Sequence, residues 1–203
     1  CKETATASYK KSETSKAFKL NAKTNGNGKL TYTTSNKAVA TVDAAGKVTV
    51  KGPGVAKITV KAAATTDYKA ASKTVTVTVA PKKQGISLVN KIKKQLTIKW
   101  KKNTKASGYQ VVYSTNKKFT GKKTVRKAKT TTSYKIKGLK KGKKYYVKVR
   151  SYKTVNGKRI YGATAQSKKQ QSNRDDKELV RNLIYQTEQK PVPGMIDPDT
   201  GIL

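Results

Sequence analysis

Val75-Thr-Val-Thr-Val79 decides the fold of the first half of this chain. The strict alternation of Val with Thr places every Val on one face of an extended segment, which predicts a half-buried β-strand. The same period of two recurs at residues 30–32, 48–50 and 58–60. Segments rich in Gly, Asn, Asp and Pro, typical of tight turns, separate these strands. The first 80 residues are therefore predicted to form an all-β sandwich.

A second alternating series follows Pro81-Lys-Lys-Gln-Gly85, a stretch that lacks apolar side chains after its Pro. Pro cannot donate to a β-ladder and Gly is flexible, so residues 82–85 are predicted to be a linker. The second series covers residues 96–100, 109–113, 134–136 and 145–149, and predicts another sandwich. Asn156-Gly157 is a strong signal for a hairpin between its last two strands. The predicted domains are residues 1–81 and 86–168, followed by a tail over residues 169–203.

The tail differs in composition from the rest of the chain. Leu179, Val180, Leu183 and Ile184 would share one helix face, and Pro191 ends the pattern. Acidic side chains near the start favour the positive end of a helix dipole, namely those of Asp175, Asp176 and Glu178. A short C-terminal helix and an extended tail are therefore expected. The helix either folds back onto lysines of the second domain or points toward a protein partner.

Several segments of the first half share one family pattern: Phe18-Lys-Leu-Asn-Ala, Leu30-Thr-Tyr-Thr-Thr-Ser-Asn-Lys-Ala-Val-Ala-Thr-Val-Asp43, Gly46-Lys-Val-Thr-Val, Gly54-Val-Ala-Lys-Ile-Thr-Val and Asp67-Tyr-Lys-Ala-Ala. Over roughly residues 5–80 they resemble a bacterial Ig-like domain of group 2 (Big2). The resemblance implies a small extracellular module, used in surface adhesins and as a spacer or carrier in secreted bacterial proteins.

The second half carries Trp100 at the end of a predicted strand, and Leu139 shortly before Tyr145. With this spacing, residues 86–166 resemble a fibronectin type III domain. The resemblance implies that Trp100 is buried and that the Tyr145 hydroxyl bonds to nearby backbone at a domain corner. Residues 140–144 lack the Pro common in that family, and the hairpin at residues 156–157 lacks Arg-Gly-Asp, so integrin-type recognition is not expected. The predicted fold class is all-β, two tandem Ig-like β-sandwiches with the short C-terminal helix and extended tail.

Lysine dominates the charge of the chain. The formal net charge is +37, and only five of the 47 basic residues are Arg. Such a charge predicts association with polyanions at low salt, because bound phosphates or carboxylates release their counterions. Base reading favours the planar fork of Arg over the point charge of Lys, so sequence-specific nucleic-acid recognition is not expected.

The resemblance to a fibronectin type III domain places the first, third and fifth loops of the second domain at one pole. Lysines gather in these three loops and form the candidate polyanion-binding cluster: Lys91, Lys93, Lys94, Lys117, Lys118, Lys122, Lys123, Lys140, Lys141, Lys143 and Lys144. Two aromatic alternatives are weaker. Trp100 could stack on a sugar, and exposed tyrosines could line a glycan-binding strip: Tyr113, Tyr146, Tyr152 and Tyr161.

Catalytic residue types are scarce. The chain has no His, its one Cys is Cys1, and no Asp or Glu lies between Tyr68 and Arg174. Acid–base, nucleophilic and metal-assisted chemistry would lack their usual side chains in this half, so no enzyme activity, metal or cofactor is predicted. Asp197 and Asp199 are read as a turn, not a calcium loop. Cys1 is either the lipid-bearing first residue of a lipoprotein, which would tether the chain to a membrane, or a fragment boundary.

These observations predict a non-catalytic, extracellular spacer or presentation module of a bacterial surface or secreted protein. Its charge would hold it to an anionic cell-wall polymer or glycan. One alternative is an adhesin module with a defined glycan site on exposed Tyr and Lys side chains. Another is an accessory region of a larger secreted enzyme. Nucleic-acid binding remains a further alternative that needs only charge.

Overall fold

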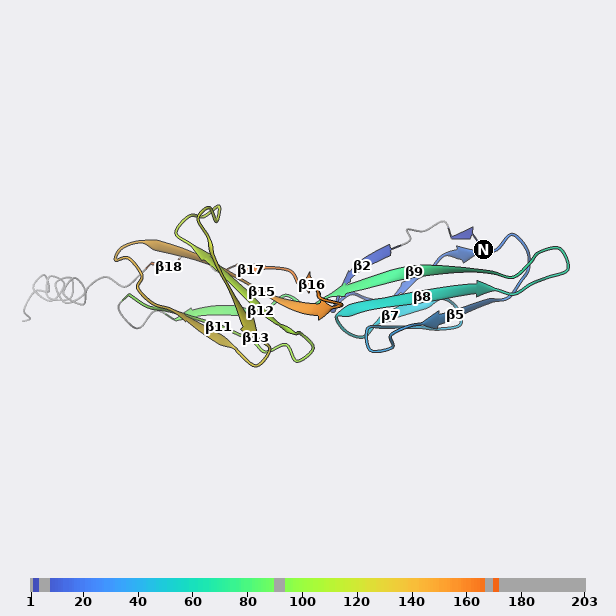
Figure 1. Ribbon diagram of the computed structural model, residues 1–203, viewed down its shortest axis with the longest axis horizontal. Coiled ribbons are helices and arrows are strands. Elements are labelled where there is room, and N and C mark those ends of the chain that lie inside the picture. Colours follow the sequence, from blue (N-terminus) through green and yellow to red (C-terminus); the bar gives the residue numbers. More distant parts are fainter. Residues whose placement is uncertain (1, 4–7, 90–93, 167–169, 172–203) are drawn as a thin grey trace, which may run out of the picture.

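A computed structural model of the chain describes residues 2–3, 8–89, 94–166 and 170–171, and in these ranges every regular element is a β-strand. Two β-rich units lie end to end along the long axis (Figure 1). This arrangement confirms the all-β, sandwich-like fold class. The predicted C-terminal helix and extended tail lie outside the described residues.

The first unit contains nine strands: β1 (Lys2–Glu3), β2 (Ser8–Ser12), β3 (Phe18–Lys19), β4 (Ala22–Lys23), β5 (Leu30–Thr34), β6 (Ala40–Val42), β7 (Lys47–Val50), β8 (Gly54–Ala62) and β9 (Ala71–Ala80). Strands β5, β7, β8 and β9 contain the four alternating segments that the sequence singled out.

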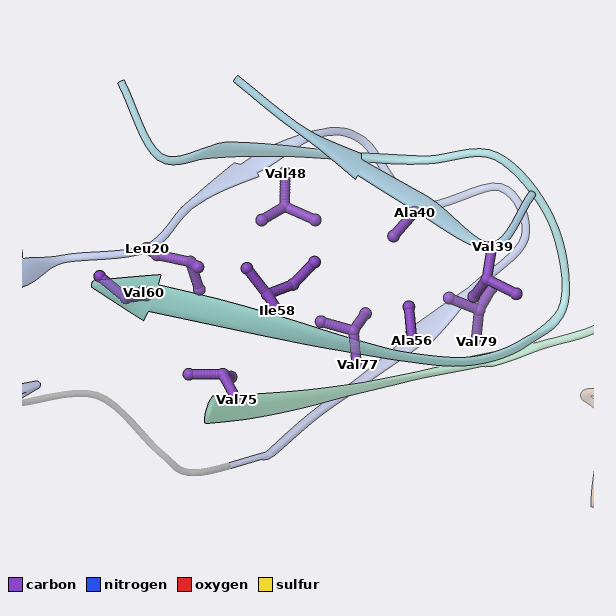
Figure 2. Packing of buried hydrophobic residues seen from close by; sticks show 10 residues of the cluster. All are labelled: Leu20, Val39, Ala40, Val48, Ala56, Ile58, Val60, Val75, Val77 and Val79. Carbon is purple, nitrogen blue, oxygen red and sulfur yellow. The ribbon is translucent and has the colours of Figure 1, made fainter. Parts of the chain in front are cut away.

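Two sheets form the sandwich of the first unit, in the orders β2-β9-β8-β5 and β3-β7-β6, and β1 pairs with β4. Strand β2 runs parallel to β9, whereas the other pairs in these sheets are antiparallel. Figure 2 shows Val48 and Ala40 of the smaller sheet facing Ile58 and Val77 of the larger one. These side chains are fully buried, as the alternation predicts.

The second unit contains the other nine strands: β10 (Ile86–Val89), β11 (Leu96–Trp100), β12 (Gly108–Ser114), β13 (Lys123–Ala128), β14 (Ser133–Ile136), β15 (Lys144–Val155), β16 (Lys158–Tyr161), β17 (Ala165–Gln166) and β18 (Gln170–Gln171). They form one sheet in the order β10-β11-β14 and another in the order β13-β12-β15-β16. Strands β17 and β18 also pair with β15.

The core of the second unit has the aromatic centre that the sequence predicted. Trp100 is 5% exposed and packs against Tyr109, with ring centroids 5.3 Å apart. Tyr145 is buried, and its hydroxyl accepts a hydrogen bond from the backbone N–H of Lys140 at 3.0 Å. Both interpretations, Trp100 as a packing residue and Tyr145 as a corner residue, are confirmed. Burial leaves no open face of Trp100 for a sugar to stack on.

The hairpin between β15 and β16 also forms as predicted. Val155 pairs with Lys158, so Asn156 and Gly157 alone make the turn, and their φ angles are 48° and 73°. Positive φ at both turn residues is the geometry that matches the twist of the flanking strands. This hairpin positions β16 beside the first unit, where it contacts β9.

Polar contacts join the two units. Glu13 Oε2 accepts hydrogen bonds from the backbone N–H of Lys82 at 3.1 Å and from Asn103 Nδ2 at 3.0 Å. Gln84 is buried and donates from Nε2 to Ser151 Oγ at 3.2 Å. Residues 81–85 carry no strand but are tied to both units by these bonds. The domain boundaries themselves stay a prediction.

Candidate functional site

The three loops of the predicted lysine cluster meet in part at one end of the second unit. A hollow of about 480 Å³ is lined there by Lys123, Lys137, Lys140 and Lys143, together with the buried Leu139 and Tyr145. The backbone N–H of Leu139 donates to the carbonyl of Lys94 at 3.0 Å, which ties the loop before β11 to the loop after β14. We call the described lysines of this end the lysine pole: Lys94, Lys123, Lys137, Lys140, Lys141, Lys143 and Lys144.

The remaining members of the predicted cluster lie elsewhere. Lys91 and Lys93 are outside the described residues, and so is the tail segment that was predicted to fold back here. Lys117 is exposed in the loop between β12 and β13 and lines neither this hollow nor the one beside Lys118 and Lys122. Lys118 and Lys122 belong to the same loop but line a separate hollow on the sheet face. The structure therefore divides the cluster between two places.

The second hollow is about 310 Å³ and lies on the outer face of the sheet β13-β12-β15-β16. Its cations come from two segments: Lys118 and Lys122 from the loop, and Lys148 and Arg150 from β15. Gln110 and Val112 of β12, Phe119 of the loop, Thr124 of β13 and Thr164 complete the lining. We call this the arginine hollow.

Arg150 is fixed in orientation by two neighbours. Its Nε donates a hydrogen bond to Gln110 Oε1 at 2.7 Å, and its guanidinium carbon lies 3.8 Å from the ring centroid of Tyr161. Tyr161 in turn meets Tyr152 edge to face, with centroids 5.9 Å apart. A guanidinium stacked on an aromatic ring and bonded through Nε keeps its remaining N–H groups in a defined plane.

The loop above the hollow is held by its own hydrogen bonds. Ser114 Oγ donates to the carbonyl of Thr120 at 2.8 Å, and the backbone N–H of Lys118 donates to Asn116 Oδ1 at 2.7 Å. Phe119 has φ of 62°, a left-handed conformation that is uncommon for an aromatic residue. Its ring is 7% exposed, with Lys148 Nζ 3.9 Å from the ring centroid.

The predicted tyrosine strip forms only in part, because Tyr146, Tyr152 and Tyr161 share the outer face of the sheet and Tyr113 lies on the core face. Tyr113 is opposite Val147 in the ladder and packs against the core. Tyr152 and Tyr161 face each other as a cross-strand pair and carry arginines near their rings. Tyr146 alternates with the core residues of β15, so it lies on the other face from Tyr113.

Sequence reasoning missed Gln110, Lys148 and Arg150. One signal could have found the two cations: both alternate with the buried valines of β15, which puts them on its outer face. A second signal was the rarity of Arg in a lysine-rich chain. No short sequence pattern predicts the hydrogen bond of Gln110 to Arg150, because this bond depends on which strands lie beside β12.

Other chemistry finds no support in the described part of the chain. No group of three His, Cys, Asp or Glu side chains gathers there in a way that could hold a metal ion. The described residues also contain no helix of the length and apolarity needed to cross a membrane. A hollow of about 850 Å³ at the first unit borders Lys19, Lys23 and Lys29 but contains no acid, His or Arg.

Comparisons with known proteins find a family model similar to each of the two units. Residues 13–65 match the family model for the immunoglobulin-like domain of intimin, and residues 79–168 match that for the fibronectin type III domain. Group 2 of the bacterial Ig-like domains is not the family named. A search of curated proteins finds no significant match.

Two solved structures are similar to the chain. The FN1–FN3 domains of chicken CNTN1 align with a TM-score of 0.42 and 16% identity, over 64% of this chain and 48% of that one. A redesigned β-sandwich protein aligns with a TM-score of 0.38 and 14% identity, over 44% of this chain and 89% of that one. The chain thus spans about half of the CNTN1 fragment.

Domains of both matched families are typically non-catalytic and are usually extracellular or surface-exposed modules. Their order along the chain agrees with the two β-rich units of the structure. The chain therefore matches the models of an intimin-like Ig domain and a fibronectin type III domain in tandem.

Proposed function

We propose that the chain is a non-catalytic extracellular spacer or presentation module of a bacterial surface or secreted protein, with charge-driven attachment to anionic cell-wall polymers or glycans. The observation that carries the proposal is the lysine pole, where exposed lysines from the start of β13 and from the loop between β14 and β15 border one hollow, and no acidic residue lies between Tyr68 and Arg174. Such a surface attracts any polyanion through counterion release. Membership of the first domain in bacterial Ig-like group 2, and membrane tethering through a lipid on Cys1, belong to the same proposal.

The end-to-end arrangement supports the spacing role. The two units are joined by a few polar contacts at their ends, so each keeps its sheet faces open to the surroundings (Figure 1). A tandem of this kind separates whatever precedes it from whatever follows it. A second candidate function, recognition of an acidic glycan at a defined site, is favoured by the arginine hollow.

The experiment that tests attachment is a salt titration of polyanion binding by the full chain. Binding to heparin, a teichoic-type polymer and DNA should weaken steeply between ~50 and ~200 mM salt, with little preference among the three. Replacing Lys123, Lys140 and Lys143 by Gln should weaken binding at each salt concentration. The matched control replaces three exposed lysines of the first domain, Lys29, Lys57 and Lys61.

Two results would count against the proposal. If wild-type protein fails to bind every polyanion at ~50 mM salt, charge-driven attachment is wrong. If the control variant loses as much affinity as the pole variant, attachment depends on total charge, and the lysine pole has no special part in it.

A further inference from the structure

We propose that the arginine hollow is a specific binding site for a sulfated or carboxylated sugar unit of an acidic polysaccharide, with Arg150 as its principal anion-binding side chain. The inference deepens the proposed function, on which it rests, by naming a ligand class and a second site. It separates a defined recognition site on the sheet face from the diffuse charge of the lysine pole.

The arginine hollow concentrates positive charge that no acidic side chain of the second domain compensates. Lys118, Lys122, Lys148 and Arg150 line one hollow of about 310 Å³. None of them forms an ion pair with a carboxylate within the described residues, and the second domain contains no acid. Like charges held around a small concave volume repel each other, and a bound oxyanion would relieve that repulsion.

The described arginines lie together on one face of the second domain. Arg126, Arg150 and Arg159 are the three arginines among the described residues, and all fall on the outer face of the same sheet. Arg126 and Arg150 both lie opposite Gln110, one from each neighbouring strand. Arg159 lies opposite Thr154, four residues beyond Arg150 on β15. Lysines, by contrast, occur on both units and on both sheets of the second domain.

This distribution matters because the two cations bind anions differently. The guanidinium of Arg presents a planar fork of donors that matches carboxylate, sulfate and phosphate oxygens, whereas the ammonium of Lys is a point charge. The gathering of the described arginines on one face, among many lysines, therefore indicates directional recognition at that face.

The side chain of Arg150 is preorganised for anion binding. The bond to Gln110 and the stack on Tyr161 hold Arg150 before any ligand arrives. The guanidinium N–H groups of Arg150 other than Nε–H have no hydrogen-bond partner within the described part of the chain. Binding then requires little loss of side-chain freedom, which is a main cost of recruiting a flexible cation.

A loop with a strained backbone conformation forms one wall of the hollow. Phe119 adopts a left-handed backbone conformation, which is costly for a bulky residue, and its ring is covered by Lys148. Hydrogen bonds from Ser114 and to Asn116 maintain the loop in this shape. The loop thereby holds Lys118 and Lys122 over the sheet, and Thr124 and Thr164 line the same hollow.

The chemistry of the lining favours a sugar over a nucleic acid. Single-stranded nucleic acids are bound chiefly by stacking their bases on exposed aromatic faces. The aromatic ring in this hollow, Phe119, is 7% exposed and lies beneath Lys148 Nζ. The amide of Gln110 and the hydroxyls of Thr124 and Thr164 instead suit the hydroxyl groups of a sugar. The volume is at the small end of ligand sites, which fits one sugar unit.

The test compares variants of the full chain that change charge equally at different places. Binding of a heparin-derived oligosaccharide is measured by calorimetry at ~200 mM salt, where diffuse attraction is weak. We expect Arg150→Gln to lose about tenfold in affinity, the value of one good charge-assisted contact. Lys135→Gln, an exposed residue of β14 in the opposite sheet, should lose less than about twofold.

Arg150→Lys distinguishes the contribution of the planar guanidinium donors to affinity from the contribution of the positive charge. This variant keeps the positive charge, so full affinity in Arg150→Lys would overturn directional recognition. We expect it to bind nearly as weakly as Arg150→Gln, because the bond to Gln110 and the planar donors are both lost.

Gln110→Glu tests the site without replacing Arg150, so that a loss of binding can be distinguished from unfolding of the domain. A carboxylate at position 110 would pair with Arg150 from the side that already bonds to it, so the fold should be retained. The internal anion should nevertheless abolish binding of the oligosaccharide. Retained binding in a folded Gln110→Glu protein would sink the proposal.

Three further probes identify the source of the anion. Inorganic sulfate alone should shift the NMR signals of the hollow only weakly, and an uncharged oligosaccharide should not shift them. If sulfate alone binds as tightly as the oligosaccharide, no sugar unit is recognised. If Arg150→Gln weakens the binding of a short DNA duplex more than it weakens the binding of the oligosaccharide, the proposed ligand class is wrong. Equal losses in Arg150→Gln and Lys135→Gln would reject the site but leave diffuse attachment intact.

Discussion

Trp100 carries much of the packing in the second domain, and it does so with one polar atom unsatisfied. It is 5% exposed and packs against Tyr109, yet its Nε1 has no hydrogen-bond partner among the described residues. Trp100→Ala should lower the free energy of unfolding by about 3–5 kcal/mol, the usual cost of emptying a large aromatic site. Urea denaturation of the full chain, followed by circular dichroism, measures this loss.

Trp100→Phe separates the packing of the ring from the effect of the unsatisfied Nε1 N–H. It keeps a ring against Tyr109 and removes the buried N–H that lacks a partner, so the loss should be clearly smaller than for Ala. Unchanged stability in Trp100→Ala together with lost glycan binding would show that the indole is an exposed platform.

Strand β12 must lie close to its neighbours, and Gly108 permits this approach. A Cβ at position 108 would lie 2.6 Å from the carbonyl oxygen of Lys127 and 2.6 Å from Tyr152 Oη. Gly108→Ala should therefore destabilise the domain by about 1–3 kcal/mol through overpacking. Because Tyr152 contacts Tyr161, on which Arg150 stacks, the same change should also weaken oligosaccharide binding. Thermal unfolding and calorimetry measure the two effects.

Gly85→Ala, a change outside β12, is the matched control for Gly108→Ala. No atom lies within 4 Å of the Cβ that Ala would add there, and Gly85 has no positive φ. Its stability should be unchanged or slightly raised, because Ala restricts the unfolded chain. Equal losses at positions 85 and 108 would contradict the close-packing explanation.

At the scale of the whole molecule, one acidic side chain links the two domains. Glu13 is 9% exposed and accepts bonds from Lys82 and Asn103, and Lys105 Nζ lies 4.0 Å from its Oε1. Glu13→Ala would leave the amide of the buried Asn103 and the backbone N–H of Lys82 without their acceptor at the junction. We expect it to lower the interdomain coupling free energy by about 1–3 kcal/mol. Two separate thermal transitions and a wider interdomain angle distribution in small-angle scattering should result.

Glu13→Gln distinguishes the hydrogen bonds from the charge. The amide oxygen can still accept from Lys82 and Asn103, while the contact with the half-exposed Lys105 ammonium is lost. Exposed ion pairs contribute little, so this variant should behave nearly like wild type. If Glu13→Gln lowers the interdomain coupling free energy as much as Glu13→Ala does, the coupling depends on the charge of Glu13 and not on its hydrogen bonds.

Local pattern was enough to predict several elements of this protein. The alternating segment at residues 96–100 became β11, the Asn156-Gly157 signal became a two-residue turn, and Trp100 and Tyr145 are buried as expected. These features depend on the period of the strand, on the φ preferences of turn residues and on apolar side-chain size. All of them can be read from residues close together in the sequence.

The arginine hollow and the junction were decided only by tertiary structure. Gln110 lies between Arg126 and Arg150 because β12 pairs with both β13 and β15, and Arg150 is 40 residues away in the chain. Glu13 meets Asn103 across 90 residues. Partner choice and register between distant strands follow from the whole set of buried contacts and not from any local segment. Local sequence therefore determined which face each side chain takes, and long-range pairing determined which side chains meet there.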